Sequence, residues 1–449
     1  MDFEEKVKDI INLSKKMGAE ESDITIILNN IKDMEIRNGK LEKFSDNISR
    51  KGKLRLFKKG KSSIIYFSEF NDKKLKNHIM KSLSFLELST VDFANTLPAE
   101  NEIGKVKNDL DLYDKNNMGF SINRLTNNLI KMENSAFDYS SKIKHSEGAS
   151  YQFIESEIFF ANSQGFLSDF KTSSHSYYIS VIAEENGRKE DGSYWSENIH
   201  FNSLEIPEFL GAKAAEQAVG KIGSKKPLTG EYTVVFNNLS ASSILEEFAE
   251  MIRGDLIYNK SSFFSEKLND KIASDKISIE DNPLIKGLVM SRPFDGEGVL
   301  SKRTEILEKG VLKSYLLNTY TANKLKIKNT GNSLLSAESD QISPSNFFIK
   351  PSDIDETDLI DSVKKGIYIT SIMSADNINK TTGDFSWGAE GFMIERGKLT
   401  NPLSEFTIAG NIMNLFQNIV EIGDNSDFNR NTISSPSFMV VKGITIGGR

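Results

Sequence analysis

The chain contains no cysteine in its 449 residues, and histidine occurs only four times. A chain without cysteine cannot be cross-linked by disulfides, and it cannot build thiolate zinc sites, iron–sulfur clusters or a cysteine nucleophile. Its fold must therefore be stabilised by an apolar core. The apolar fraction of 38% is ordinary for a soluble globular protein. The length is enough for about three domains of usual size.

Charge and hydropathy exclude further classes of protein. The formal net charge is −7 and there is no concentrated basic block, which is unfavourable for binding nucleic acid or an anionic membrane. No stretch of eighteen apolar residues predicts a transmembrane helix. The first residues lack the basic region and the apolar region of a secretory signal. We therefore expect a soluble cytoplasmic protein, with neither nucleic acid nor membrane among its partners.

The spacing of apolar residues predicts an α+β fold, with an α+β amino-terminal region and a β-rich carboxy-terminal domain. Turn signals such as Asn38-Gly39 and Asp191-Gly192 separate the extended segments. Helices are expected over 3–17, 71–86, 121–137, 206–219 and 240–253. Extended segments are expected over 23–28, 32–37, 53–57, 63–67, 149–161, 166–173, 176–184, 232–236, 299–306, 311–317, 345–350, 366–373, 391–395 and 437–447.

The same patterns divide the chain into four ranges. An α+β unit is predicted over residues 1–95, and a polar linker or crossing loop over 96–118. A central α+β unit is predicted over 119–225, and the β-rich domain over 226–449. We find no internal repeat and no low-complexity tract in the sequence.

The sequence shows neither a metal motif nor a nucleophile motif. No histidine begins a His-Glu pair, and no two lie within the three to five residues that would place them on one helix face around zinc. A G-x-S-x-G elbow and a P-loop are absent. Ser141 and Lys144 form an S-x-x-K pattern, but the polar neighbours of Lys144 provide no burial to lower its pKa. We predict no catalytic residue and no metal ligand in this chain.

Glu246 and Glu250 lie four residues apart on the predicted helix 240–253 and therefore share one of its faces. The apolar stripe of that helix contains Leu245 and Phe248, so the two glutamates lie beside it. We interpret them as the solvated edge of the helix. A metal-independent hydrolase that uses Glu246 or an unidentified serine is another hypothesis, although no arrangement of base and nucleophile supports it.

Three glycine-rich segments, 291–298, 329–332 and 382–391, are more specific. Glycine lets the backbone approach a ligand or another strand closely, and the neighbouring Thr, Ser and Asn add hydrogen-bond donors. The same composition is typical of tight turns and bulges in a twisted β domain. From the residues alone, both interpretations stay open.

Together with TIAGN at 407–411 and ITIGG at 444–448, these segments resemble the TldD/PmbA family. KSSFF at 260–264 and GVLKSYLLNTY at 310–320 support the resemblance. It covers nearly the whole chain and is strongest from residue 226 onward. Within the family the chain is most similar to the PmbA branch, which is also called TldE.

The resemblance implies a fold of the TldD/PmbA type and a specific zinc chemistry. In this family the TldD subunit binds zinc through H-E-x-x-x-H on a helix and a distant cysteine, and the glutamate acts as general base. On that motif, Leu245 and Glu250 take the histidine positions and Glu246 keeps the acid. Leucine cannot bind zinc, and no cysteine exists to complete the site. The resemblance therefore implies no zinc or other cofactor in this chain, and zinc only in a TldD-like partner.

The resemblance also implies a partner and a substrate. The partner is a TldD-like catalytic subunit in a heterodimer, and the substrate is an extended peptide held in a cleft of the carboxy-terminal domain. This chain is then a non-catalytic subunit that helps to enclose the cleft and stabilises the pair. A stand-alone homodimeric peptide-binding protein is the alternative. The older family description, modulator of DNA gyrase, does not imply DNA binding. The residues predicted to line the cleft are Asn332, Thr382, Gly383, Asp384, Ser386, Gly388 and Gly391.

Overall fold

The computed structural model describes residues 2–106, 109–115, 121–430 and 432–449. Part of the predicted linker 96–118 and the first two residues of the predicted unit 119–225 lie outside the described residues.

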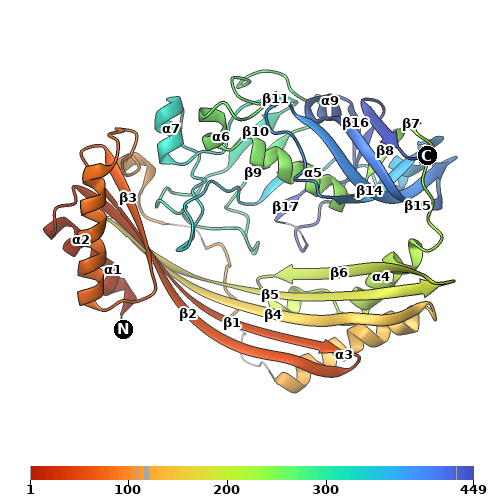
Figure 1. Ribbon diagram of the computed structural model, residues 1–449, viewed down its shortest axis with the longest axis horizontal. Coiled ribbons are helices and arrows are strands. Elements are labelled where there is room, and N and C mark those ends of the chain that lie inside the picture. Colours follow the sequence, from red (N-terminus) through yellow and green to blue (C-terminus); the bar gives the residue numbers. More distant parts are fainter. Residues whose placement is uncertain (1, 107–108, 116–120, 431) are drawn as a thin grey trace.

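A long curved sheet forms one layer, and the carboxy-terminal domain lies above it (Figure 1). The helices are α1 (Phe3–Lys16), α2 (Asp72–Leu88), α3 (Ile122–Tyr139), α4 (Pro207–Gly220), α5 (Asn238–Met251), α6 (Gly254–Tyr258), α7 (Thr319–Leu325), α8 (Glu356–Asp361) and α9 (Ile412–Gln417). The strands are β1 (Glu21–Arg37), β2 (Lys40–Lys58), β3 (Lys61–Phe67), β4 (Ile143–Asn162), β5 (Leu167–Glu185), β6 (Arg188–Asn198), β7 (Gly230–Glu231), β8 (Thr233–Phe236), β9 (Ile279–Asp281), β10 (Thr304–Glu308), β11 (Val311–Leu312), β12 (Phe347–Ile349), β13 (Lys365–Met373), β14 (Asp384–Glu395), β15 (Lys398–Asn411), β16 (Ile419–Ile422), β17 (Ile433–Ser434), β18 (Phe438–Val440) and β19 (Ile444–Gly447).

The amino-terminal sheet contains six antiparallel strands in the order β3-β2-β1-β4-β5-β6. Its four longest strands have 17 to 20 residues. At about 3.3 Å per residue, each of them is roughly 60 Å long. Asn38-Gly39 forms the turn between β1 and β2, with φ angles of 51° and 71°. This left-handed geometry favours an Asn-Gly dipeptide, so the predicted turn is confirmed.

Two strands of this sheet each join two segments that the sequence predicts separately. The predicted segments 23–28 and 32–37 belong to the single strand β1, which stays paired with β2 and β4 across the polar residues between them. In the same way, 176–184 and all but the first residue of 166–173 are parts of β5, which begins at Leu167. Polar side chains do not end a strand whose backbone groups have partners on both sides.

The turn predicted at Asp191-Gly192 is wrong. Both residues lie inside β6, and the turn between β5 and β6 is formed by Asn186-Gly187. Gly192 serves the packing of a helix instead, because a Cβ at this position would lie 2.2 Å from the carbonyl oxygen of Ala214 in α4. Close approach of a helix to the strand is the reason for this glycine.

Helices α1 to α4 cover one face of the six-stranded sheet, and the carboxy-terminal domain faces the other (Figure 1). Ile24 and Ile26 of β1 pack in the apolar cluster that contains residues of α1 and α2. Met34 and Ile36 pack in the cluster with α3 and α4. These four residues point to the same face because side chains alternate along a strand. The first and the central predicted units therefore share one sheet, joined by the pairing of β1 with β4.

The carboxy-terminal domain contains an eight-stranded sheet, β16-β18-β8-β13-β14-β15-β19-β7, and a five-stranded sheet, β11-β10-β9-β12-β17. Helix α5 packs with both, and its residues Ile244, Leu245 and Phe248 are fully buried. The α+β class and the β-rich character of this domain are confirmed. None of the helices in the described ranges is long and apolar enough to cross a membrane.

Strand boundaries in this domain differ from the prediction. β10 begins only at Thr304, and β11 has two residues where the pattern predicts 311–317. The predicted segment 391–395 is the end of the longer strand β14, and 437–447 is divided between β18 and β19. β15 was not predicted because it contains Pro402 and pairs with β14 through bulges, which interrupt its alternation.

Candidate functional site

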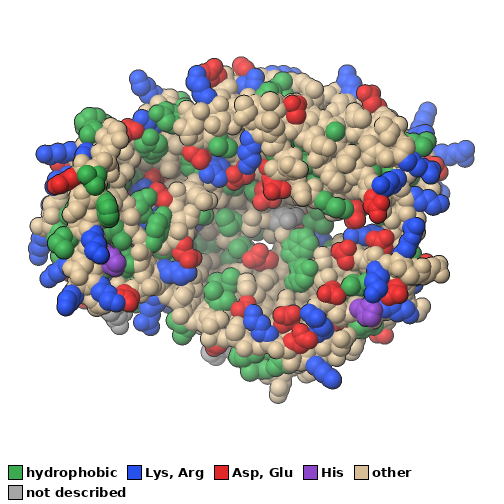
Figure 2. Space-filling model, viewed as in Figure 1, with side chains coloured by type: hydrophobic (Ala, Val, Ile, Leu, Met, Phe, Trp, Pro, Cys, Tyr) green, Lys and Arg blue, Asp and Glu red, His purple; other side chains and the backbone are tan. Residues whose placement is uncertain are grey.

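A cavity of about 350 Å³ lies between the six-stranded sheet and the carboxy-terminal domain. The surface is hollowed between these two parts in the space-filling view (Figure 2). Strands β2 and β3 and the segment 94–96 form one wall, and four segments of the carboxy-terminal domain form the other. Its charged lining residues are Arg55, Arg253, Asp255, Glu297 and Asp340.

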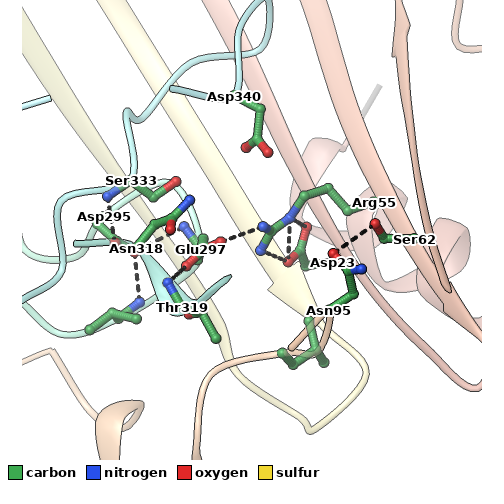
Figure 3. Close-up of polar contacts among 12 residues, drawn as sticks. Asp23, Arg55, Ser62, Asn95, Asp295, Glu297, Asn318, Thr319, Ser333 and Asp340 are labelled. Atoms are coloured by element: carbon green, nitrogen blue, oxygen red, sulfur yellow. Dashed lines mark hydrogen bonds and ion pairs between the residues drawn. The ribbon is translucent and has the colours of Figure 1, made fainter. Parts of the chain in front are cut away.

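Arg55 lies at the centre of the polar contacts of this cavity (Figure 3). Its Nε donates to both carboxylate oxygens of Asp23 at 3.0 Å, and its Nη1 donates to Oε1 of Glu297 at 2.5 Å. All three side chains are buried. Burial opposes the charge of Arg55, but the two carboxylates outweigh it and hold the pKa of Arg55 well above its ordinary value. Asp23 belongs to β1 and Glu297 to the carboxy-terminal domain, so this contact joins the two layers.

Asp295 lies beside this network and is fully buried. It accepts backbone N–H bonds from Glu297 at 2.9 Å, from Val299 at 3.0 Å and from Ser333 at 3.0 Å. These bonds favour the carboxylate. Burial and the neighbouring charge of Glu297 act more strongly and raise the pKa of Asp295 to about 7. The group therefore titrates near neutral pH.

Three alternate residues of β2, Lys51, Lys53 and Arg55, point to the same face of the sheet. Each forms an ion pair with a carboxylate of the carboxy-terminal domain. Lys53 is fully buried, and its Nζ lies 3.1 Å from Oδ1 of Asp340. Although burial opposes it, attraction to Arg55 and Lys53 holds the pKa of Asp340 below its ordinary value. Strand β2 therefore holds the carboxy-terminal domain against the sheet.

Helix α5 places the three residues of the altered zinc motif in different surroundings. Leu245 is fully buried in the core, whereas Glu246 is exposed. Surrounding protein and the nearby charge of Glu250 raise the pKa of Glu246. Oε2 of Glu250 lies 2.8 Å from Nη1 of Arg253 and 3.7 Å from Nζ of Lys380. Arg253 also lines the cavity, so Glu250 is linked to it through this guanidinium.

These residues do not fit a zinc ion. Leu245 has no ligand atom, and the carboxylate of Glu250 is already neutralised by two cations. In the part of the chain that the structure describes, no group of three or more His, Cys, Asp or Glu side chains is placed to hold a metal ion. A zinc-dependent step therefore has no ligands at this helix.

The predicted cleft residues of the third glycine-rich segment lie at and before the start of β14. Thr382, Asp384 and Ser386 are exposed. Asn411 donates its Nδ2–H to Oδ1 of Asp384 at 2.9 Å, and this bond holds the pKa of Asp384 below its ordinary value. Gly383 has a φ of 78° and forms the turn before the strand. These side chains present a polar surface rather than a closed pocket.

Gly388 and Gly391 lie farther along β14. A Cβ on Gly391 would lie 1.9 Å from the carbonyl oxygen of Tyr368 in β13, so this glycine is required by strand packing. β14 pairs with β13 on one side and with β15 on the other. Its main-chain groups are therefore used within the sheet, and a peptide cannot be added to it as a further strand.

Asn332 lies in another part of the domain, where it is fully buried. Its Nδ2 donates to Oδ2 of Asp281 at 2.7 Å and to the carbonyl oxygen of Ser343 at 3.2 Å. None of the seven predicted cleft residues is among the described residues that line the 350 Å³ cavity. Their contact with a peptide stays a prediction.

Sequence reasoning missed Asp23, Arg55 and Glu297. The three residues are far apart in the chain, and a single charged residue is typical of a solvated surface. One local signal is the glycine-rich segment 291–298, which contains Glu297. The other is the alternation of cations with apolar Leu54 and Leu56 in β2, which is typical of a strand with one charged face. That pattern does not show which acids the cations contact.

Two family models match the chain. The PmbA/TldA metallopeptidase central domain matches residues 116–222, and the PmbA/TldA metallopeptidase C-terminal domain matches residues 229–448. The chain belongs to the PmbA/TldD family. The resemblance found in the sequence is thereby confirmed.

Individual relatives of this family member agree with the match. The metalloprotease PmbA homolog of Buchnera aphidicola subsp. Acyrthosiphon pisum is 30% identical over 439 residues, covering 97% of this chain and 94% of the relative. The metalloprotease PmbA of Escherichia coli O157:H7 is 32% identical over 302 residues, covering 67% and 65%. A Bacteroides thetaiotaomicron protein whose crystal structure carries the name modulator of DNA gyrase superposes with a TM-score of 0.89 at 27% identity, covering 99% and 98%. TldE from Thermococcus kodakarensis superposes with a TM-score of 0.87 at 18% identity, covering 99% and 100%, which supports the fold alone.

Proposed function

We propose that this chain is the non-catalytic, PmbA/TldE-like subunit of a two-subunit zinc metallopeptidase that processes or degrades peptides and unfolded proteins. Zinc belongs only to a TldD-like partner, and this chain encloses part of the cleft and stabilises the pair. The relatives named metalloproteases support peptide hydrolysis as the activity of the assembly.

The observation that carries this proposal is the altered motif on α5. The helix is present and packed, but Leu245 is buried in the core where the catalytic branch needs a ligand. Glu250 at the second ligand position is paired with Arg253 at 2.8 Å. Both changes favour a packed, metal-free helix, and hydrolysis then requires another chain.

The proposal is tested with the isolated chain and with a TldD-like subunit of the same organism. Elemental analysis of the isolated chain should find far less than one zinc per chain, and the chain should not hydrolyse an unstructured peptide substrate. Mixed with the partner, it should form a stable complex in light scattering and change the partner's hydrolysis rate. One zinc per isolated chain would overturn the proposal. A tight homodimer that ignores the partner would favour the peptide-binding alternative.

Glu246 provides a matched control, because it keeps the position of the general base. In the complex, Glu246→Gln should leave the rate within about twofold, whereas the same change in the partner's H-E-x-x-x-H motif should lower it by about 10² to 10⁴. A comparable loss with Glu246→Gln would show that this chain is itself catalytic.

A further inference from the structure

A second cavity, of about 330 Å³, lies between the same two layers. Its floor contains one row of side chains that crosses four neighbouring strands. Lys51 of β2 lies opposite Ile27 of β1, Ile27 lies opposite Ile158 of β4, and Ile158 lies opposite Phe170 of β5. Directly opposed residues point to the same face, so the three apolar side chains form a continuous strip.

A polar row lies beside this strip. Asn29, Ser156 and Thr172 oppose one another on β1, β4 and β5, and Ser156 Oγ donates to Asn29 Oδ1 at 2.8 Å. The roof consists of the segments 289–292 and 334–338 of the carboxy-terminal domain. The lining of the cavity is therefore about half apolar and half polar, with an apolar strip and hydrogen-bonding groups side by side, so it can contact both parts of an amphipathic small molecule.

Arg292 is the cation of the roof, and it is only 5% exposed. Its Nη2 reaches the carbonyl oxygen of Gly331 at a long 3.5 Å, and its Nε has no hydrogen-bond partner among the residues that the structure describes. No carboxylate of the described residues lies within 4.0 Å of its guanidinium nitrogens. A buried guanidinium is normally paired and hydrogen-bonded, because an unpaired buried charge is strongly unfavourable.

The nearest acids are committed to other contacts. Asp281 accepts from Asn332 and from Ser345, and Asp295 accepts three backbone N–H bonds. Both acids attract Arg292 at longer range, yet burial still lowers its pKa. Glu338, the acid that lines this cavity, is paired with Lys51. Within the described part of the chain, the guanidinium therefore lacks a contacting anion.

We propose that this cavity binds a small carboxylate with an apolar body, with the carboxylate on Arg292 and the apolar part on Ile27, Ile158 and Phe170. Arginine binds carboxylates with well-defined geometry, and the apolar strip removes the rest of the ligand from water. The volume corresponds to roughly eleven water molecules, or to a ligand of about a dozen non-hydrogen atoms. The site uses none of the residues of α5, so it is independent of the proposed peptidase role.

Isothermal titration of the full-length protein tests the proposal with three probes: N-acetyl-L-leucine, its neutral amide and octanoate. N-acetyl-L-leucine should bind at least tenfold more tightly than the amide, which has no charge for Arg292. If octanoate binds as tightly as N-acetyl-L-leucine, the ligand class of the cavity is simple aliphatic carboxylates. If octanoate binds more weakly, the ligand class is N-acylated amino acids, whose amide contacts the polar row. The proposal is wrong if neither acid binds more tightly than the amide.

Two variants locate the site. Arg292→Met removes the guanidinium, and Ser336→Trp fills the cavity from the roof while Arg292 is kept; each should weaken binding of the acid at least tenfold. Arg303→Met is the charge-matched control, because Arg303 is exposed, pairs with Glu280 and does not line this cavity. It should bind like the parent protein. If Arg292→Met does not fold, Ser336→Trp decides alone, and unchanged binding in that variant would contradict the location.

Discussion

At the scale of single residues, the buried acid Asp295 couples the stability of this protein to pH. Asp295 has a pKa of about 7 in the folded chain, against an ordinary value of 3.8. Between these values the folded state holds more protons than the unfolded state, so the free energy of unfolding falls as the pH rises. This contribution is fully present below about pH 4 and is lost as the pH rises through about 7.

We predict that the free energy of unfolding of the parent, taken relative to that of Asp295→Asn and measured by urea denaturation, decreases between about pH 5 and pH 8. The amide does not titrate, so the variant lacks the proton that the parent releases. Asp384→Asn is the control, because Asp384 is exposed and its pKa lies below 3.8, so it stays ionised over this range. Equal pH dependence in the parent and in Asp295→Asn would contradict the assignment.

Single residues could be predicted from sequence where local geometry alone decides them. Asn38-Gly39 was predicted because its turn needs two residues with positive φ. Asp191-Gly192 has the same composition, but there the glycine is needed for contact with α4, which no local pattern shows. The buried Arg55 was missed because its partners Asp23 and Glu297 are distant in sequence.

At the scale of elements, strand β2 determines how the two layers are held together. Its residues Lys51, Lys53 and Arg55 reach the carboxy-terminal domain, and Arg55 bridges Asp23 and Glu297. Removing one partner of a buried ion pair leaves an uncompensated charge, which is far more unfavourable than removing the whole pair. The sequence of β2 alone predicts the charged face, and the fold supplies the partners.

We predict that Arg55→Met lowers the free energy of unfolding by about 3–5 kcal/mol, because Asp23 and Glu297 are left buried without their cation. Adding Glu297→Gln to Arg55→Met should restore part of this loss, so the two changes are not additive. Denaturant unfolding of the two single variants and the double variant measures the coupling. Arg50→Met is the matched control, because Arg50 is exposed on the opposite face of the same strand and should change stability by less than about 0.5 kcal/mol. Additive effects would contradict the buried network.

The elements could be predicted to different degrees. α1, α2, α3, α4 and α5 were predicted because each has an apolar stripe of helical period, which is local information. β15 was not predicted, because Pro402 and the bulges interrupt its alternation and only its pairing with β14 and β19 defines it. Local patterns are equally insufficient for the candidate site. The sequence predicts that Glu246 and Glu250 share one helix face, but the cavity is formed by segments from both layers, whose contacts no local pattern shows.

At the scale of the whole molecule, the two layers contact each other at several places. Phe160 and Phe166 of the amino-terminal part pack with Phe294 of the carboxy-terminal domain, with ring centroids 5.6 to 5.7 Å apart. At another contact, Trp195 Nε1 of β6 donates to the carbonyl oxygen of Arg430 at 2.8 Å. The ion pairs of β2 add a third contact. Because these contacts bury aromatic rings and charges, separating the layers is unfavourable, and the chain should unfold as one cooperative unit.

The two tryptophans allow this cooperativity to be measured. Trp195 is half-buried at the contact between the layers, and Trp387 is fully buried in the carboxy-terminal core, stacked on Phe385 at 3.8 Å. Trp387→Phe leaves Trp195 as the fluorescent reporter, and Trp195→Phe leaves Trp387. We predict that, in each of these chains, urea unfolding followed by fluorescence has the same midpoint as unfolding followed by circular dichroism. With Arg55→Met added, the Trp195 signal should change at lower urea than the Trp387 signal, because the contact between the layers is then weakened first. If the Trp195 signal changed at lower urea than the Trp387 signal in chains that keep Arg55, the layers would unfold independently. The ion pairs of β2 would then not couple them.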